Sequence, residues 1–126
     1  MVKELIPTEE EEQQALFRWL AFAGNQKPEL LLMIHIPNEG KRSQAAGARL
    51  KSVGLRKGVP DLFLPVPKGR YHGLWIEMKR LKGSKTSKEQ KEWIEALNGQ
   101  GYFAAVCFGW VDAKETIERY MKGEGK

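Results

Sequence analysis

GVPDLFLPVPKGRYHGLWIEMK, residues 58–79, is the stretch that decides the fold expected for this chain. It contains two apolar runs of strand length, residues 61–66 and 73–78, separated by Pro67-Lys68-Gly69-Arg70. Proline, glycine and charged residues between two apolar runs are typical of a turn. We therefore expect a hairpin of two antiparallel strands.

Three charged residues fall at one end of this hairpin. Asp61 opens the first strand behind Pro60, and Glu77 and Lys79 lie at the end of the second. Side chains at positions i and i+2 of a strand share a face, and antiparallel pairing places Asp61 opposite the end of the second strand. Charges in a buried strand are costly unless they are paired or bind a metal. The alternatives are a simple Glu77–Lys79 ion pair and a metal site that includes Asp61.

A pair of carboxylates with open coordination positions suits Mg²⁺ or Mn²⁺, since hard ions prefer oxygen ligands. Zinc is disfavoured, because the chain has two histidines, His35 and His72, and one cysteine. A bound Mg²⁺ polarises a phosphoryl oxygen and activates water. Lys79 could orient or deprotonate that water or stabilise the transition state, and the sequence does not separate these roles.

The chain before the hairpin predicts a helix and a strand. Residues 8–23 place apolar side chains at helical spacing, namely Leu16, Trp19, Leu20 and Ala23. Residues 30–36 form a partly branched apolar run that ends at Pro37, which predicts a strand. His35 lies inside that run, where packing or hydrogen bonding is the more common role.

The chain after the hairpin predicts a helix, a strand and a helix. The first helix begins at Thr86 or Ser87, and its core face is Trp93, Ile94 and Leu97. Residues 102–108 predict a strand that joins the sheet in parallel, and Asp112 is expected to cap the last helix, whose inward face is Ala113, Ile117, Tyr120 and Met121. The element order predicts an α/β fold with a central mixed β-sheet flanked by helices (α-β-β-β-α-β-α).

Gln90 lies near the start of the predicted helix and on the same face as Trp93 and Ile94. One interpretation is a capping box in which its side chain returns to the Ser87 backbone. The other is a role in the active site. Both remain open from the sequence.

A basic segment precedes the hairpin. Residues 40–60 contain no acidic residue but six positive charges, at Lys41, Arg42, Arg49, Lys51, Arg56 and Lys57. A solvated loop is one interpretation of this run. Contact with the phosphates of a nucleic acid is favoured, because it explains the lack of neutralising acids.

Composition limits the class of protein. With 126 residues, 41% of them hydrophobic, the chain is expected to form one domain over residues 1–126. A net charge of +5 and a pI near 9.4 favour a polyanionic partner. No apolar run reaches transmembrane length and no signal peptide is evident, so an intracellular, cytoplasmic protein is expected. Cys107 is expected to be a buried structural thiol.

The motifs Gly58-Val59-Pro60-Asp61, Glu77-Met78-Lys79 and Ser87-Lys88-Glu89-Gln90 resemble the VRR-NUC branch of the PD-(D/E)XK nuclease superfamily. The similarity covers most of the chain, through Phe108, and implies a restriction-endonuclease-like core. It implies that Asp61 and Glu77 bind a divalent metal, that Lys79 is catalytic and that Gln90 supports the site. The carbonyl of Met78 would add a metal contact.

The resemblance also implies a glutamate on the first helix. A spacing of four to a glutamine, followed by apolar residues at +7 and +11, selects Glu9 with Gln13, Leu16 and Leu20. Glu12 lies on the same face and is the alternative.

The small stand-alone members of this family, found in phages and bacteria, resemble junction-resolving enzymes and tend to form homodimers. The resemblance therefore implies a Mg²⁺- or Mn²⁺-dependent DNA endonuclease of DNA repair that cuts branched DNA such as a four-way (Holliday) junction. The alternatives are a catalytically inactive nucleic-acid-binding module of the same fold and a ribonuclease of the same superfamily. No residue pattern in the chain separates DNA from RNA as the substrate.

Overall fold

The structure is a computed structural model that describes residues 5–37 and 44–124. Its centre is a four-stranded sheet in the order β1-β2-β3-β4. The strands are β1 (Ile34–His35), β2 (Leu62–Leu64), β3 (Leu74–Lys79) and β4 (Phe103–Phe108). β1 and β3 each pair antiparallel with β2, whereas β3 and β4 are parallel. The predicted hairpin and the predicted mixed sheet are both confirmed.

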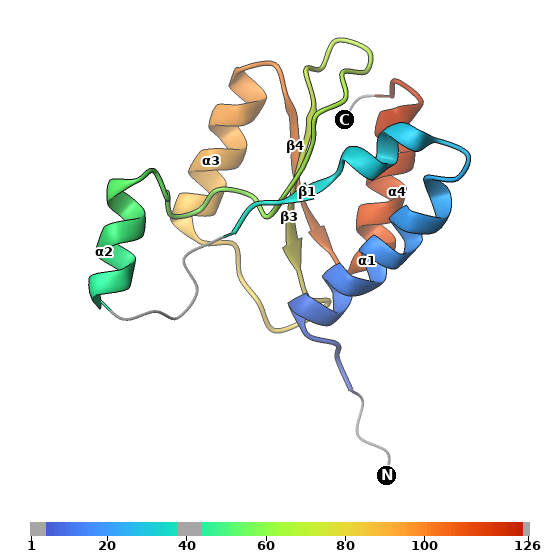
Figure 1. The fold of residues 1–126 in the computed structure, drawn as a ribbon. Helices are drawn as coiled ribbons and strands as arrows, with labels where there is room; N and C mark the ends of the chain where they lie inside the picture. The colour runs from blue at the N-terminus through green and yellow to red at the C-terminus, as the bar shows by residue number, and fades with distance from the viewer. Residues whose placement is uncertain (1–4, 38–43, 125–126) are drawn as a thin grey trace.

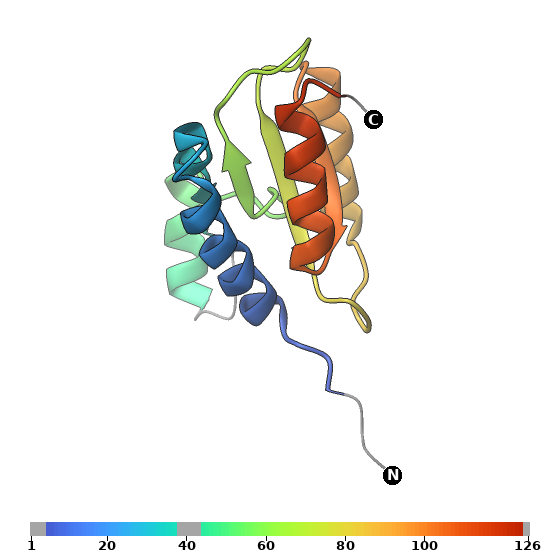
Figure 2. The same ribbon diagram turned by 90° about the vertical axis from the view of Figure 1, so that its right-hand side faces the viewer.

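Helices cover the two faces of this sheet unequally. α1 (Glu9–Ala23) and α4 (Trp110–Met121) pack side by side on one face, as Figures 1 and 2 show. α3 (Lys88–Gly99) packs on the opposite side, against β4. α2 (Gln44–Ser52) stands out from the side of the molecule beyond α3 (Figure 1).

The hydrophobic core lies between the sheet and the pair α1 and α4. The inward face predicted for the last helix is confirmed, since Ala113, Ile117, Tyr120 and Met121 are buried. The Tyr120 hydroxyl donates a 2.6 Å hydrogen bond to the carbonyl of Val66. The face predicted for α3 is only half-buried, because α3 packs on β4 and leaves the other strands of that face uncovered. Trp93, Ile94 and Leu97 are its half-buried residues.

The strand predicted over residues 30–36 is mostly wrong. A short 3₁₀ helix, η1, spans Pro28–Leu32, and only Ile34–His35 is a strand. Pro28 begins η1, where its fixed φ suits a helical turn. Leu30 and Met33 are both buried, and a spacing of three residues places them on the same side of a 3₁₀ turn.

Two further predictions are corrected. The basic segment is not simply a loop, because Gln44–Ser52 forms α2, whose alanines favour a helix. Asp112 does not cap the last helix: α4 begins earlier, at Trp110, and its N-cap residue is Gly109 with φ of 86°. The Asp112 carboxylate instead accepts a 2.9 Å hydrogen bond from the main-chain N–H of Phe108.

Candidate active site

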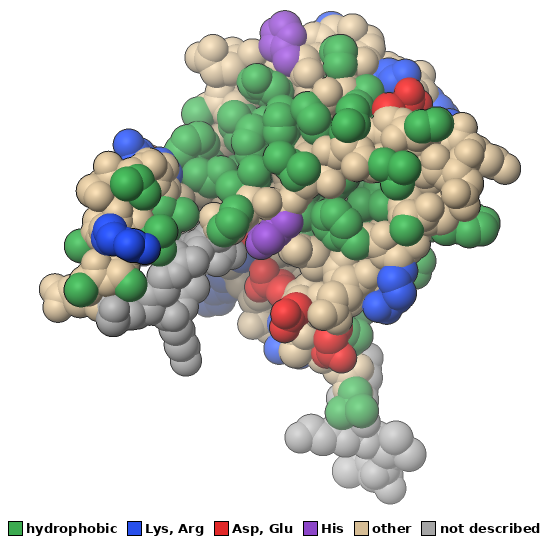
Figure 3. All heavy atoms as spheres, in the orientation of Figure 1, with side chains coloured by type: hydrophobic (Ala, Val, Ile, Leu, Met, Phe, Trp, Pro, Cys, Tyr) green, Lys and Arg blue, Asp and Glu red, His purple; other side chains and the backbone are tan. Residues whose placement is uncertain are grey.

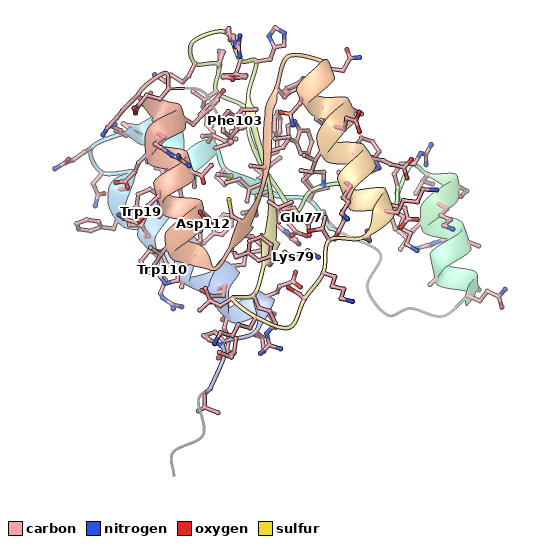
Figure 4. The ribbon with its side chains drawn as sticks, turned by 180° about the vertical axis from the view of Figure 1, so that it is seen from behind. Trp19, Glu77, Lys79, Phe103, Trp110 and Asp112 are labelled. Atoms are coloured by element: carbon pink, nitrogen blue, oxygen red, sulfur yellow. The ribbon has the colours of Figure 1, made fainter. Side chains whose placement is uncertain are left out.

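Three carboxylates from distant parts of the chain meet beside the end of β3. Glu9, Asp61 and Glu77 each place one carboxylate oxygen within 4.8 Å of the other two. Asp61 and Glu77 are buried, at 4% and 2% exposure, whereas Glu9 is exposed at the start of α1. Figure 4 shows Glu77 beside Lys79 on β3. The structure therefore brings together three acidic residues that were predicted from the sequence to lie in one site.

Asp61 is held by the hairpin itself. Its Oδ2 atom accepts a 2.9 Å hydrogen bond from the main-chain N–H of Met78, on the neighbouring strand. Its own carbonyl accepts a hydrogen bond of 2.6 Å from the N–H of Ile36. Both the side chain and the main chain of Asp61 are thus fixed by neighbouring strands, so the carboxylate is positioned before any ligand arrives.

Gln90 forms the predicted capping box and also contacts Glu77. Its Oε1 atom accepts from the Ser87 N–H at 2.9 Å, and its own N–H donates to the Ser87 hydroxyl at 3.1 Å, which is a complete capping box. Its Nε2 atom donates a 3.0 Å hydrogen bond to Oε2 of Glu77. The helix start therefore fixes the amide that orients the Glu77 carboxylate.

Glu77 is not fully satisfied by its protein neighbours. Lys79 Nζ lies 3.9 Å from Glu77 Oε2, so the Glu77–Lys79 ion pair is present within the site. Oε1 of Glu77 is buried and has no hydrogen-bond partner among the described residues. A buried carboxylate oxygen without a partner is rare in folded proteins. That oxygen is available to a cation.

Electrostatics at this site favour the binding of positive charge. Burial, with the nearby Asp61 carboxylate, raises the pKa of Glu77 to about 9, although Lys79 opposes the shift. Burial also raises the pKa of Glu9. Without a cation, Glu77 retains a proton at neutral pH that a glutamate in water would lose. The chemistry of this donor set, three carboxylates and no nitrogen or sulfur ligand, fits a hard divalent ion such as Mg²⁺.

The two candidate glutamates of α1 have different positions. Glu9 reaches the carboxylate cluster, whereas Oε1 of Glu12 accepts a 3.0 Å hydrogen bond from the main-chain N–H of Trp110. Trp110 is the first residue of α4, and its N-cap Gly109 has no side chain to cap the helix. Buried Glu12 is therefore the cap of α4.

Gly58 has a role that the sequence analysis missed. Its φ is +93°, and a Cβ at this position would lie 2.6 Å from the carbonyl carbon of Glu89 in the first turn of α3. Only glycine permits both that backbone conformation and that close approach. The residue thus lets the segment leading to Asp61 lie against the helix that carries Gln90. A Gly-Val-Pro-Asp motif at a strand entrance was the signal available in the sequence.

The predicted phosphate-binding residues lie outside the carboxylate cluster. Lys41 and Arg42 are outside the described residues, and Arg49 and Lys51 are exposed on α2. Exposed Arg56 donates to the carbonyl of Lys51 at 3.3 Å. Lys57 Nζ lies 4.0 Å from Oε1 of Glu89, so α3 supplies a neutralising acid that the segment itself lacks.

Comparison with known proteins decides the family. A family model described as the VRR-NUC domain matches residues 4–110. The chain belongs to the VRR-NUC family. A solved structure described as a VRR_NUC domain protein is 31% identical to it, with a TM-score of 0.79, over 97% of this chain and 95% of that one. A search of curated proteins gave no match.

The VRR-NUC assignment confirms the resemblance drawn from the motifs and gives the chain a nuclease-type α/β fold compatible with the restriction-endonuclease-like architecture. None of the helices in residues 5–37 and 44–124 has the length and hydrophobicity of a transmembrane segment.

Proposed function

We propose that this VRR-NUC protein is a Mg²⁺- or Mn²⁺-dependent DNA endonuclease that hydrolyses phosphodiester bonds in branched DNA. The observation that carries the proposal is the meeting of Glu9, Asp61 and Glu77 around a buried carboxylate oxygen that has no described partner. The proposed catalytic unit is one domain over residues 1–126.

Each residue of the proposed site has a distinct task. Asp61 and Glu77 hold the ion, with Glu9 and the carbonyl of Met78 as further oxygen donors. The ion, when bound, polarises the phosphoryl oxygen and lowers the pKa of a bound water. Gln90 keeps Glu77 in its orientation through the 3.0 Å hydrogen bond. Lys79, 3.9 Å from Glu77, positions the attacking water or stabilises charge that develops on the phosphoryl group.

The proposed phosphate contacts come from the basic segment. Arg49 and Lys51 project from α2, which has no buried residues among those described. Arg56 and Lys57 follow, and Lys41 and Arg42 are assigned to the same role from the sequence alone. Contacts of this kind position a nucleic acid without reading its sequence.

A second copy of the chain is the proposed partner for the part of the sheet that α3 leaves uncovered. The apolar residues of this surface are Ile34, Phe63, Trp75 and Tyr102. Phe63 and Trp75 stack with centroids 4.3 Å apart, and Ile34 is 48% exposed. Figure 3 shows hydrophobic side chains gathered over the strands on this side. Pairing two copies would present two active sites to the strands of one junction.

Light scattering tests this partner. An Ile34→Glu, Phe63→Glu protein should have the mass of one chain where the parent has the mass of two. Phe22→Glu is the matched control, since Phe22 is 76% exposed on α1 and lies outside this surface. A parent protein with the mass of one chain would contradict the homodimer.

Cleavage of a labelled four-way junction in Mg²⁺ tests the function itself. The parent protein and the exposed control Glu115→Gln should cut, whereas Asp61→Ala, Lys79→Ala and the parent in EDTA should not. Binding without metal-dependent turnover by the parent would instead support an inactive binding module. Faster cutting of a matched RNA junction would support the ribonuclease.

A further inference from the structure

A groove between α1 and β1 adjoins the carboxylate cluster but shares no residue with it. Its volume is about 370 Å³, and it is lined by Glu10, Gln13, Gln14 and Phe17 of α1 and by His35 of β1. A volume of this size is within the range of small-molecule sites. Figure 3 shows a histidine and acidic side chains close together on this side of the molecule.

The orientation of His35 is fixed by the strand that carries Asp61. Its Nδ1 atom lies 3.2 Å from the main-chain carbonyl of Asp61. A carbonyl only accepts hydrogen bonds, so Nδ1 must carry the hydrogen. In the neutral ring, Nε2 on the other side is then a hydrogen-bond acceptor. His35 therefore offers an acceptor to a ligand in the groove.

The other residues of the groove suit a nucleic-acid base better than a phosphate. Gln13 and Gln14 carry amides, each with donors and an acceptor, and Phe17 supplies a half-buried aromatic ring. Bases stack on aromatic rings and form hydrogen bonds along their edges. No lysine or arginine is among the residues that line the groove, and the Glu10 carboxylate would repel a phosphate.

Chain connectivity places the groove next to the proposed catalytic centre. Glu10 follows Glu9, and Gln13 lies one helical turn beyond Glu9 on α1. His35 is hydrogen-bonded to the main-chain carbonyl of Asp61. Each side of the groove is therefore next to a residue of the carboxylate cluster. A ligand in the groove would lie beside a phosphate held at that cluster.

We infer that this groove receives a base of the nucleic acid, from a nucleotide that flanks the phosphate being cut. Phe17 stacks on the base, and His35 Nε2 with the Gln13 and Gln14 amides contacts its edge. A base inside an intact duplex is covered by neighbours on both faces, so the groove selects a nucleotide that is unpaired or unstacked. This inference rests on the proposed nuclease function, and it gives a reason for a preference for branch points.

Removal of single bases from the substrate tests the groove. Junctions with one abasic nucleotide, at each position around the mapped cut in turn, keep every phosphate and lose one base. All proteins carry Lys79→Ala to keep the substrate intact, and binding in Mg²⁺ is measured by fluorescence anisotropy. One abasic position should weaken binding about tenfold, the effect expected when a stacked base is lost.

The abasic effect should depend on the groove. With Gln13→Ala, Gln14→Ala and His35→Asn added, the difference in affinity between the intact and the abasic junction should become smaller, because the contacts to the base edge are lost while Phe17 remains. Alanine preserves helix propensity, and asparagine retains a donor for the Asp61 carbonyl. The control Gln26→Ala lies beyond the end of α1 at Ala23, which is about 15 Å along the helix from Gln13, and should keep the full abasic effect. Equal melting temperatures would show that the variants are folded.

Two outcomes would overturn the inference: no abasic position weakens binding, or the groove variant shows the same abasic penalty as its parent. The proposed function is judged separately, by metal-dependent cutting of the intact junction with Lys79 restored. A protein that cuts but shows no groove-dependent penalty loses only the inference. A protein that does not cut loses the proposed function, whatever the abasic scan gives.

Discussion

The carboxylate cluster and α2 carry opposite charges and are built in opposite ways. Asp61 and Glu77 are almost fully buried, and each is fixed by a hydrogen bond from a neighbouring element. Arg49 and Lys51 are exposed on a helix with no buried residues among those described. Chemistry on a phosphate needs fixed groups that are removed from water, whereas attraction to a polyanion needs only charge in roughly the right place.

The difference also appears in stability. Placing three carboxylates together, with Asp61 and Glu77 buried, leaves Glu77 with a pKa of about 9, so the cluster destabilises the metal-free fold at neutral and higher pH. The charges of α2 do not destabilise the fold in this way, because they remain in water. Mutations in the carboxylate cluster should therefore change turnover, whereas mutations in α2 should change affinity.

The largest effect is expected from Lys79→Ala. Its loss should lower kcat by at least about 10²-fold, the effect of removing one preorganised group that stabilises charge. Binding of the four-way junction, measured by anisotropy, should change little. A variant that cuts at the parent rate would remove Lys79 from the site.

The stability of the metal-free protein should depend on pH with a definite sign. The folded-state pKa of Glu77 is raised from 4.5 to about 9, so the folded protein holds a proton that the unfolded chain releases. The free energy of unfolding in EDTA should therefore fall as pH rises from about 4.5 to 9. Glu77→Gln should flatten this fall, and Mg²⁺ should reduce it. Thermal melts across pH measure all three, and a rise in stability over that range would contradict the burial argument.

The double variant Arg49→Ala, Lys51→Ala should act on affinity alone. Binding should weaken to a similar extent on all DNA sequences, and the slope of log K against log salt should fall by about 2, near one unit per lost phosphate contact. Turnover at saturating DNA should not change. The same salt slope in the variant and in the parent would show that α2 does not contact phosphates.

The smallest effect is expected from Glu12→Ala, and Glu9→Gln is its matched comparison. Loss of the Glu12 cap should lower the free energy of unfolding by about 0.5–2 kcal/mol and leave metal affinity unchanged. Glu9→Gln should weaken Mn²⁺ binding and leave stability almost unchanged. Denaturant melts and titration calorimetry distinguish the two, and the reverse pattern would exchange their roles.

Local patterns predicted the hairpin and most of the cluster. The two-residue period of strands placed Glu77 beside Lys79, and antiparallel pairing brought Asp61 to them, as the structure shows. The sequence left Gln90 between two roles because its capping pattern is local, whereas its bond to Glu77 depends on how α3 packs.

The remaining features depend on contacts that no local pattern encodes. Glu12 and Trp110 are 98 residues apart, so nothing near Glu12 indicated that it caps α4. In α2, the alanines between the charges favour a helix, which the pattern of charges alone does not indicate. The strand expected over residues 30–36 is limited to Ile34–His35. Pro28 begins a 3₁₀ turn, which buries Leu30 and Met33 at a spacing of three.

The central claim is that Glu9, Asp61 and Glu77 bind the divalent ion that supports cutting. Anomalous diffraction from crystals soaked in Mn²⁺ tests it most directly. The account predicts a Mn²⁺ peak about 2.0–2.6 Å from carboxylate oxygens of Asp61 and Glu77, the range for oxygen ligands of hard divalent ions. A peak at another place, or none at this cluster in a protein that cuts DNA with Mn²⁺, would contradict it.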